Sequence, residues 1–474
     1  MNVTSRHVTI TPQLELVQGP PPPDAGVPIS RFDTLIVGGG PAGLAPLVSA
    51  CRTGGLDRML AGGLAVVEQG QAIGPGQIGS YAINSDSSAD TIVNCVQGST
   101  HPVLATLANH PTTIAVAAYG RGSVPLPLVG AFMAVVGKAL HAKLAVSPGC
   151  AVRLDSRAIQ TQRTAGGEWC TTIVQVSDGA RAKILSRLVI FATGGVQPLA
   201  RLEFEDAAGA PLMPRYARKL LQSGDVLVAG GTEAIARRLE TCLDPRIAII
   251  GSSSSAIASA CALLKSRLGQ RLTAGAVTVL HRRPLRIFYA SAAAALAEGY
   301  DEFGPDDICP VSGFVFRFAG FRLESRELVM AARGIGGRPS EPRLRLHHLG
   351  VGSDDLARSI IDRADLVIAA LGYRPRALPV VAVSGEPIPL HAEGPGSQPL
   401  VDGRCRVLDA AGEPIPGLLG VGLAVGFVSR EAVGGEPSFS GQTNGLWQWQ
   451  NDVGAIIAEC VGAPAHPSAR LATS

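Results

Sequence analysis

The sequence predicts an α/β protein in which two similar units, each a strand, a tight turn and a helix, are separated by a small β-meander. The first unit is residues 33–52 (DTLIVGGGPAGLAPLVSACR), and the second is residues 246–264 (RIAIIGSSSSAIASACALL). Each opens with a short apolar run, typical of a buried parallel strand, and continues with helical spacing. Between them, residues 152–190 alternate apolar and polar side chains around Gly166–Gly167 and Asp178–Gly179, pairs that favour hairpin turns.

The first turn has the spacing of a dinucleotide-binding loop. Gly38 permits the tight bend, Gly40 lets a pyrophosphate approach the backbone, and Gly43 lets the helix pack close to the strand. The helix N-terminus would present free N–H groups to the phosphates. Glu68, at the end of the next strand, can accept both ribose hydroxyls; the alternative is an ordinary glycine turn beside a surface glutamate. The predicted contacts of this nucleotide are Gly38, Gly40, Pro41, Gly43, Glu68 and Gln69.

The second turn keeps only the glycine at the bend. Gly251 stands there, Ser253 replaces the glycine of closest approach, and Ala256 takes the helix-packing place. Ser253 and Ser255 can cap the helix and donate hydroxyl groups to phosphate. Such a looser turn suits a nucleotide that binds and leaves. The alternative is a serine-capped helix without a ligand.

A pair of arginines follows the next strand, at the place that Glu68 occupies in the first unit. Arg282 and Arg283 can pair with a 2′-phosphate, which a carboxylate would repel. The first turn therefore fits an adenosine with a free ribose, and the second fits NADPH. The alternative is a solvated charge pair at a strand end.

Composition limits the remaining functions. The 474 residues are 46% hydrophobic and 17% charged, enough for a large core in two or three domains. A net charge of +3 without a long basic run gives no indication of nucleic acid, and no apolar run approaches a membrane span of roughly 20 residues. Nine scattered cysteines form no C-x-x-C pair, so we expect reduced cytoplasmic thiols and no metal site. Residues 1–30 are a proline-rich extension without the apolar core of a signal peptide.

With both units present, the sequence resembles the flavoproteins that have two dinucleotide-binding domains. The segments VGGGPAGLA, EQG, FATGG, GSSSSA and AALGYRP match that pattern in order, across residues 31–460. The resemblance implies two Rossmann-like dinucleotide-binding domains, with tightly bound FAD in the first and NADPH in the second, and an inserted β-meander. The implied FAD-binding domain is 31–238, the NADPH-binding domain is 239–386, and 387–474 return to the FAD-binding domain.

Within these flavoproteins the sequence is most similar to the N-hydroxylating branch of the class B monooxygenases. In that branch GGGP opens the first domain, a G-x-x-x-S-A turn opens the second, and A-T-G-Y closes it. The chain departs at Gly43, where Asn is usual, and at Leu371, where Thr is usual. Disulfide reductases need a redox cysteine pair and Baeyer–Villiger enzymes an F-x-G-x-x-x-H-x-x-x-W fingerprint, and the sequence has neither.

The first candidate for the reactive face of the flavin is residues 80–90 (SYAINSDSSAD), within a stretch, residues 71–95, that reads as a long loop. It follows the acid-ended strand, as the flavin-covering segment does in the resembling enzymes. Tyr81 and Ser85 are predicted cofactor contacts, and Asn84 and Asp86 the predicted catalytic residues. The alternative is a polar surface loop.

The second candidate is residues 437–445 (PSFSGQTNG), which would place Gln442, Thr443 and Asn444 at a helix start facing the isoalloxazine. Gln442 and Asn444 are the predicted cofactor contacts there, and the alternative is a capped helix. A third group lies in residues 289–334, where related enzymes gather substrate contacts. This group consists of Arg317, Arg322 and Arg326. These arginines could bind a carboxylate or form a solvated face, and we favour the solvated face.

The resemblance implies an NADPH-dependent FAD monooxygenase. NADPH would reduce the flavin, and a C4a-(hydro)peroxyflavin would oxygenate a small nucleophile, by expectation the nitrogen of an amine or amino acid. The rival function is an NAD(P)H:acceptor flavin oxidoreductase that oxygenates no substrate. The expected partners are the small-molecule substrate and molecular oxygen, without nucleic acid or membrane, and a homo-oligomer is compatible with the sequence.

Overall fold

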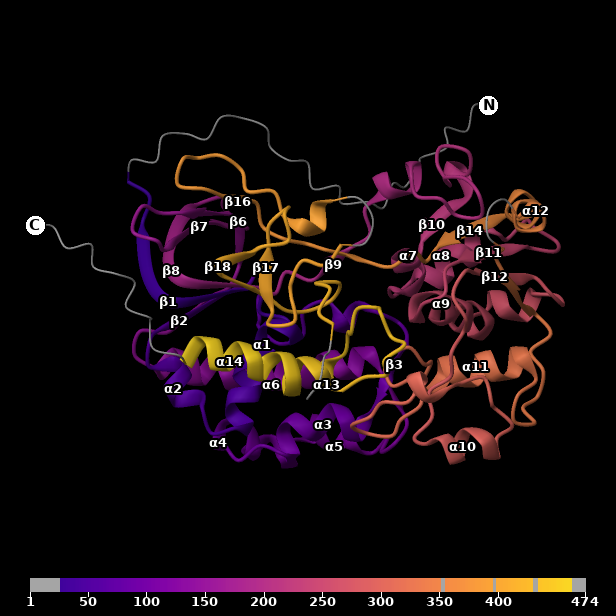
Figure 1. Cartoon of the computed structure of the whole chain (residues 1–474), viewed down its shortest axis with the longest axis horizontal. Helices are drawn as coiled ribbons and strands as arrows, with labels where there is room; N and C mark the ends of the chain where they lie inside the picture. The colour runs from indigo at the N-terminus through magenta and orange to yellow at the C-terminus, as the bar shows by residue number, and fades with distance from the viewer. Residues whose placement is uncertain (1–25, 351–353, 395–397, 429–433, 463–474) are drawn as a thin grey trace, which may run out of the picture.

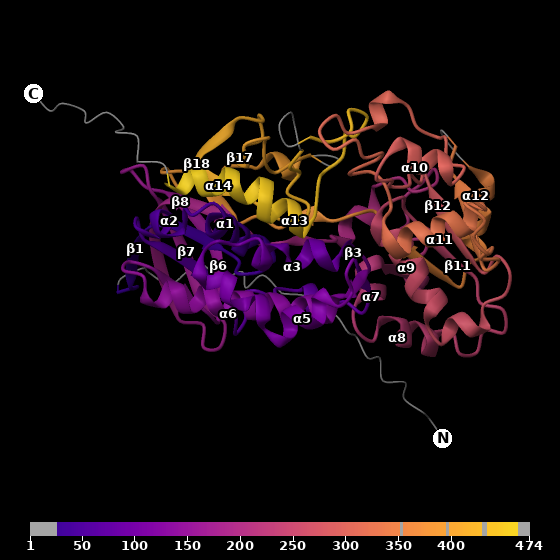
Figure 2. The same cartoon turned by 90° about the horizontal axis from the view of Figure 1, so that it is seen from below.

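The computed structural model describes residues 26–350, 354–394, 398–428 and 434–462, which form two α/β lobes lying side by side (Figures 1 and 2). The two ends of the described chain share one lobe, and the middle of the chain forms the other. The α/β fold predicted from the sequence, with two Rossmann-like domains and a β-meander, is confirmed. The expected N-terminal extension lies almost entirely outside the described residues.

The first lobe is built on a parallel sheet. Its strands follow the order β18 (Pro414–Gly420), β8 (Arg181–Phe191), β1 (Ile29–Val37), β2 (Leu64–Val67) and β5 (Ala151–Arg153). The C-terminal halves of β1 and β8 and all of β2 are buried apolar runs, as expected for strands covered on both faces. Helices α1 (Pro41–Arg52), α6 (Leu126–Val146) and α14 (Gly454–Gly462) lie below this sheet in Figure 1.

The meander is formed by β6 (Ser156–Arg163), β7 (Trp169–Gln175) and β8, as predicted. β8 is shared, because it pairs antiparallel with β7 and parallel with β1. Gly167 and Gly179, in the two predicted hairpin turns, have positive φ. This backbone conformation is one that glycine adopts without steric cost.

The second lobe repeats the arrangement. Its parallel sheet has the order β10 (Leu220–Gln222), β14 (Leu366–Ala369), β11 (Ile247–Ile250), β12 (Val277–His281) and β13 (Leu344–His348), and α9 (Ser254–Lys265) follows β11. In the first lobe β1, which precedes the turn, lies between β2 and β8. In the second lobe β11, which precedes the other turn, likewise lies between β12 and β14. The order predicted from the sequence is therefore present twice.

The chain crosses between the lobes at two short strands that pair with each other. β9 (Gly195–Val196) and β15 (Arg374–Pro375) are antiparallel and follow the ends of β8 and β14, so the FATGG and AALGYRP motifs meet in space. The chain passes from the sheet of one lobe to the sheet of the other somewhat before the predicted domain boundaries at 239 and 387. β10 already pairs with β14, and β16 (Val380–Val381) already pairs with β6.

The expectation of a long loop at residues 71–95 was wrong in part. This stretch includes η1 (Ile78–Ser80) and β3 (Asn84–Ser88), and it enters α3 (Ala89–Gln97). β3 pairs with β4 (Ser123–Pro125), a partner too distant in the sequence to leave a local signal. Ser88 caps α3 by accepting a hydrogen bond from the Thr91 N–H (3.4 Å).

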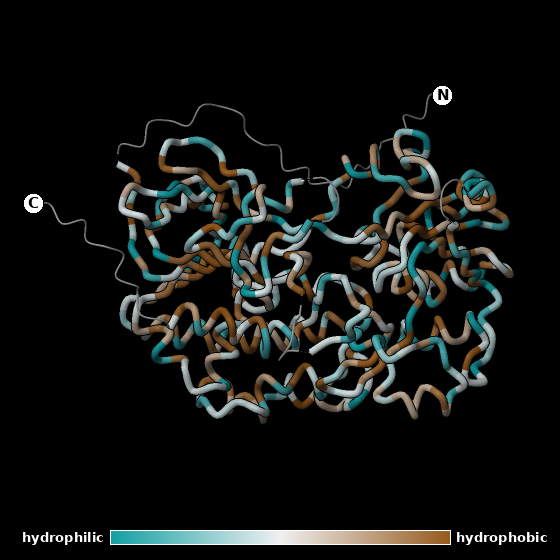
Figure 3. The backbone as a smooth tube through the Cα atoms, viewed as in Figure 1, coloured by the Kyte–Doolittle hydropathy of each residue, from teal (hydrophilic) through white to brown (hydrophobic). Residues whose placement is uncertain are grey.

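Helix α6 is long and apolar enough to cross a membrane by length and composition alone, although no such run was expected from the sequence. In the structure it packs against η1 and against α4 (Pro102–Ala105) and α5 (Pro111–Ala117). Phe132 and Met133 are fully buried in the core of the first lobe. Apolar segments likewise concentrate in the sheets and the helices against them (Figure 3). The buried face of α6 therefore belongs to that core.

Candidate active site between the two turns

The first turn uses its glycines in two ways. Gly38 has positive φ, and a Cβ there would overlap the carbonyl oxygen of Ala192 at the end of β8. A Cβ at Gly43 would overlap the carbonyl oxygen of Gly38. Gly40 differs, because a Cβ there would meet only Gly76, at the ordinary distance of 3.4 Å. The protein's own packing thus requires Gly38 and Gly43, whereas the space beside Gly40 is open to a ligand.

Glu68 stands directly after β2 and lines the same cavity as Gly40. Its carboxylate accepts hydrogen bonds from the N–H groups of Gly39 (2.7 Å) and Gly70 (2.8 Å). Each carboxylate oxygen keeps lone pairs for a further donor, such as a ribose hydroxyl. The N-terminus of α1 has no side-chain cap and no acidic residue in its first turn, so its N–H groups suit an anion. Pro41 and Gln69 also line this cavity.

The second turn is a close counterpart of the first. Gly251 has positive φ, and a Cβ there would overlap the carbonyl oxygen of Ala370 at the end of β14. A Cβ at Gly38 would overlap the carbonyl oxygen of Ala192 in the same way. Ser253 is the N-cap residue of α9, but its hydroxyl makes no capping bond and lies 3.1 Å from the Ser255 hydroxyl. The expectation that Ser253 caps the helix was therefore wrong, and its exposed hydroxyl faces the cavity.

Arg282 and Arg283 follow β12, as predicted, and both are exposed at the cavity. Arg282 donates a hydrogen bond to the Asp206 carbonyl oxygen (2.9 Å). Behind them His281 is buried, and burial lowers the pKa of its imidazole. The two arginines thus stand in the second lobe at the position that corresponds to Glu68 in the first lobe.

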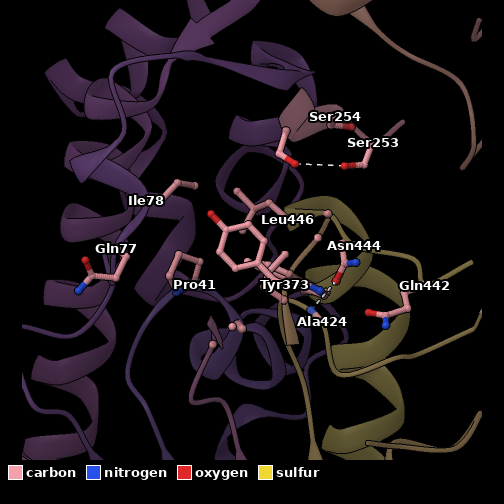
Figure 4. A pocket seen from close by; sticks show the side chains of 18 of the residues that line it. Pro41, Gln77, Ile78, Ser253, Ser254, Tyr373, Ala424, Gln442, Asn444 and Leu446 are labelled. Atoms are coloured by element: carbon pink, nitrogen blue, oxygen red, sulfur yellow. Dashed lines mark hydrogen bonds between the residues drawn. The ribbon is translucent and has the colours of Figure 1, made fainter. Parts of the chain in front are cut away.

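Both turns open into one cavity of about 3800 Å³ that runs between the lobes. Tyr373, from the AALGYRP motif, projects into it between Pro41 of the first turn and Ser253 of the second (Figure 4). The Tyr373 hydroxyl lies 3.5 Å from that of Tyr81, and burial raises the pKa of Tyr373 well above its ordinary value. Sequence reasoning used the motif to identify the domain but missed Tyr373 as a site residue.

The segment that carries Tyr81 and Asp86 lines the cavity, and its residues 84–88 form a strand, not the loop of the alternative interpretation. Asn84 donates a hydrogen bond to Glu324 (2.5 Å). The Ser85 hydroxyl donates to the Ser87 carbonyl oxygen and accepts from the Val124 N–H, which ties β3 to β4. Ser85 therefore has a structural role in addition to any cofactor contact.

Asp86 is exposed and lines the cavity, where the neighbouring protein atoms still exclude part of its water. This environment raises the pKa of the Asp86 carboxyl, and the nearby Arg322 guanidinium opposes the shift. A carboxylate that is costly to keep charged would gain from a positively charged ligand.

The C-terminal segment reaches the cavity just before helix α13 (Leu446–Gln448), and Gln442 and Asn444 line it, as Figure 4 shows. Asn444 Oδ1 accepts a hydrogen bond from the Ala424 N–H (3.2 Å). Thr443 is buried and donates to the Phe427 carbonyl oxygen. No side chain caps α13, so the capped-helix alternative was wrong.

The solvated face favoured for the three arginines of residues 289–334, a segment called the insertion from here on, was also wrong. Arg317 and Arg322 line the cavity. Burial lowers the pKa of Arg322 to about 10, with Asp86 opposing the shift, so its charge persists at neutral pH. Arg326 forms ion pairs with Glu298 and Glu327, and only 16% of its side chain is exposed.

Comparison with known proteins places this geometry in context. No family model matches the sequence. The fold resembles that of L-lysine 6-monooxygenase from Pseudomonas syringae (13% identity, TM-score 0.52) and of ornithine hydroxylase from Pseudomonas aeruginosa (12% identity, TM-score 0.50). Each match covers 91% of this chain and 99% of the solved one.

The sequence is 32% identical over 433 residues to the CMP-5′-(3-aminopropyl)phosphonate hydroxylase of Streptomyces rubellomurinus, a match that covers 90% of this chain and 97% of the relative. The monooxygenase class predicted from the sequence is thereby confirmed. This chain belongs to the family of the CMP-5′-(3-aminopropyl)phosphonate hydroxylase.

Proposed function

We propose that FAD binds at the first turn and NADPH at the second, with the residues predicted for each role. The open space beside Gly40, the uncapped N-terminus of α1 and the available lone pairs of Glu68 fit FAD. The exposed Ser253 hydroxyl and the arginine pair after β12 fit a coenzyme with a 2′-phosphate. The observation that carries the assignment is that both turns open into one cavity.

The reaction is the hydroxylation of a primary amine, in which R–NH2, O2, NADPH and H⁺ give R–NHOH, NADP⁺ and water. Bound FAD supplies the centre at which electrons from NADPH reach oxygen. The protein must bring the two nucleotides together and keep water from the reacting atoms. Tyr373 and Tyr81, whose hydroxyls lie 3.5 Å apart, both line the cavity and provide polar groups to it.

Asp86 is the residue that holds the amine. An ammonium group has no lone pair for oxygen transfer, so the site must bind it and remove a proton. Asp86 faces the cavity, and its raised pKa brings the carboxylate closer to the basicity that proton removal requires. Asn84 acts indirectly, because its hydrogen bond to Glu324 fixes the end of β3 next to Asp86.

The substrate class follows from the relative, whose name gives CMP-5′-(3-aminopropyl)phosphonate as its substrate. We assign this chain a primary amine at the end of a short alkylphosphonate that is carried on CMP. Free amino acids such as ornithine and lysine are then poorer substrates, because they lack the nucleotide. The enzyme would act in the cytoplasm, where its nine cysteines, all free thiols in the structure, stay reduced.

The test is coupling of NADPH oxidation to product. We expect FAD-loaded enzyme with CMP-5′-(3-aminopropyl)phosphonate to consume NADPH and to form a product heavier by one oxygen atom, detected by mass spectrometry. Asp86→Asn should lower kcat/KM for the amine at least about tenfold while FAD content stays unchanged. NADPH oxidation that yields only hydrogen peroxide with every amine tested would refute the hydroxylase assignment and favour a plain oxidoreductase.

A further inference from the structure

A cluster of aromatic and cationic side chains forms a part of the cavity that neither nucleotide-binding turn contributes. We name it the insertion wall, and it consists of Phe288, Arg317, Phe318, Arg322 and Phe439, all of which line the cavity. The Arg322 guanidinium carbon lies 3.6 Å from the centre of the Phe288 ring, and that of Arg317 lies 4.9 Å from the centre of Phe318. The rings of Phe318 and Phe439 are 5.8 Å apart and tilted by 40°.

The insertion wall is held in place from behind. Glu436, only 3% exposed, accepts hydrogen bonds from the N–H groups of Phe318 (3.0 Å) and Ala319 (2.8 Å). Arg286 donates to the Ser438 hydroxyl (3.1 Å), which donates to Asp307 (2.5 Å). These bonds fasten the insertion to the C-terminal segment. A wall fixed before the ligand arrives loses little conformational entropy on binding.

The charge of the wall favours an anion. Arg322 donates a hydrogen bond to the Arg317 carbonyl oxygen (2.7 Å), and Arg317 donates to the Cys309 sulfur (3.5 Å), so both side chains are oriented. The carboxylate of Glu436 is already used by backbone N–H groups. Asp86 and, more weakly, Glu436 act electrostatically on Arg322, and Asp452 acts on Arg317. Guanidinium groups of this kind pair strongly with phosphate and phosphonate oxygens.

We propose that the insertion wall is the subsite for the nucleotide half of the substrate, an inference that rests on the proposed function. Arg317 and Arg322 bind the negatively charged phosphate and phosphonate groups, and the cytosine ring packs against Phe318 and Phe439. Stacking on aromatic rings is a common way for proteins to hold an unpaired base. Asp86, beside Arg322, then receives the ammonium at the other end of the three-carbon chain.

The experiment measures binding without turnover. FAD-loaded enzyme is titrated with CMP alone by isothermal calorimetry, in the presence of saturating NADP⁺ so that the coenzyme site is filled. We expect wild-type enzyme to bind CMP and the variants Arg322→Gln and Arg317→Gln each to bind it at least about tenfold more weakly. Arg333→Gln is the matched control, because Arg333 pairs with Glu302 and lies outside the cavity lining.

Phe439→Leu provides a variant without a charge change, in case an arginine variant fails to retain FAD. It should weaken CMP binding several-fold and leave the binding of inorganic phosphate unchanged. Absence of CMP binding to the wild type, or equal binding by Arg322→Gln, Arg317→Gln and Phe439→Leu, would overturn the inference. Because the measurement needs no catalysis, an enzyme that binds CMP at the wall but hydroxylates no amine would refute the proposed function alone.

Discussion

Gly40 and Gly43 are three positions apart in one motif, yet different partners require them. A side chain at Gly43 would overlap the protein's own backbone, whereas a Cβ at Gly40 would only touch Gly76 at an ordinary contact distance and would enter the space that we assign to FAD. The backbone at Gly40 has φ of −71°, which any residue can adopt. The motif therefore combines two glycines that the fold requires, Gly38 and Gly43, with one that the proposed FAD site requires.

This difference predicts opposite results for two alanine variants. Gly40→Ala should leave the melting temperature of the FAD-free protein nearly unchanged but strip most of the flavin, measured as the ratio of 450 nm to 280 nm absorbance. Gly43→Ala should destabilise even the FAD-free protein, by about 1–3 kcal/mol, because the backbone must move apart. Full flavin content in Gly40→Ala would show that the pyrophosphate lies elsewhere.

Asp452 gives a prediction for pH. It lies in a π-helical turn, its Oδ2 is buried without a hydrogen-bond partner, and burial raises the pKa of its carboxyl to about 6. The Asp452 carboxyl thus binds a proton more tightly in the folded state than in the unfolded state. Above pH 6 the charged carboxylate therefore lowers the free energy of unfolding, and this penalty fades as the pH falls toward 4.

We therefore expect Asp452→Asn to raise the free energy of unfolding at pH 7.5 by about 1–3 kcal/mol. The gain should shrink below pH 6 and nearly vanish near pH 4. Thermal melts of both proteins across this range test it. A variant that melts lower than wild type at pH 7.5 would mean that the charged carboxylate has a stabilising partner.

At the scale of elements, the two strand–turn–helix units and the meander could be predicted, because each carries its own local pattern. β3 could not, since its partner β4 lies far along the chain and its residues are polar. The insertion wall was also missed. Phe288, Phe318 and Phe439 come from separate segments, and hydrogen bonds of Glu436 and Ser438 join two of those segments.

The Glu436 contact predicts a local loss of order. Glu436→Gln keeps the size of the side chain but removes the negative charge that strengthens its hydrogen bonds from the N–H groups of Phe318 and Ala319. We expect faster amide hydrogen exchange in residues 314–322, with little change in β11 or β12. Glu413→Gln, on an exposed turn, is the control. Unchanged exchange in the insertion would show that other contacts hold the wall.

At the scale of the whole molecule, two lobes with the same strand order hold opposite charges at matching places. Glu68 follows β2, and Arg282 and Arg283 follow β12. The paired crossings β9 and β15 join the ends of the late strands, so both turns face the same cavity. In the proposed assignment, the charge after the second strand of each lobe selects its nucleotide, and the shared fold brings the two nucleotides together.

Coenzyme preference tests this division. Replacing both Arg282 and Arg283 by Ala removes the partners of the 2′-phosphate, and one charge-assisted pair is worth about 1.5–3 kcal/mol, or roughly ten- to a hundredfold in affinity. We expect KM for NADPH to rise by that factor, while KM for NADH and the FAD content hardly change. Arg363→Ala, an exposed arginine of the same lobe outside the cavity, should alter none of these values. If the double variant instead loses FAD and keeps its preference for NADPH, the two nucleotides have been assigned to the wrong lobes.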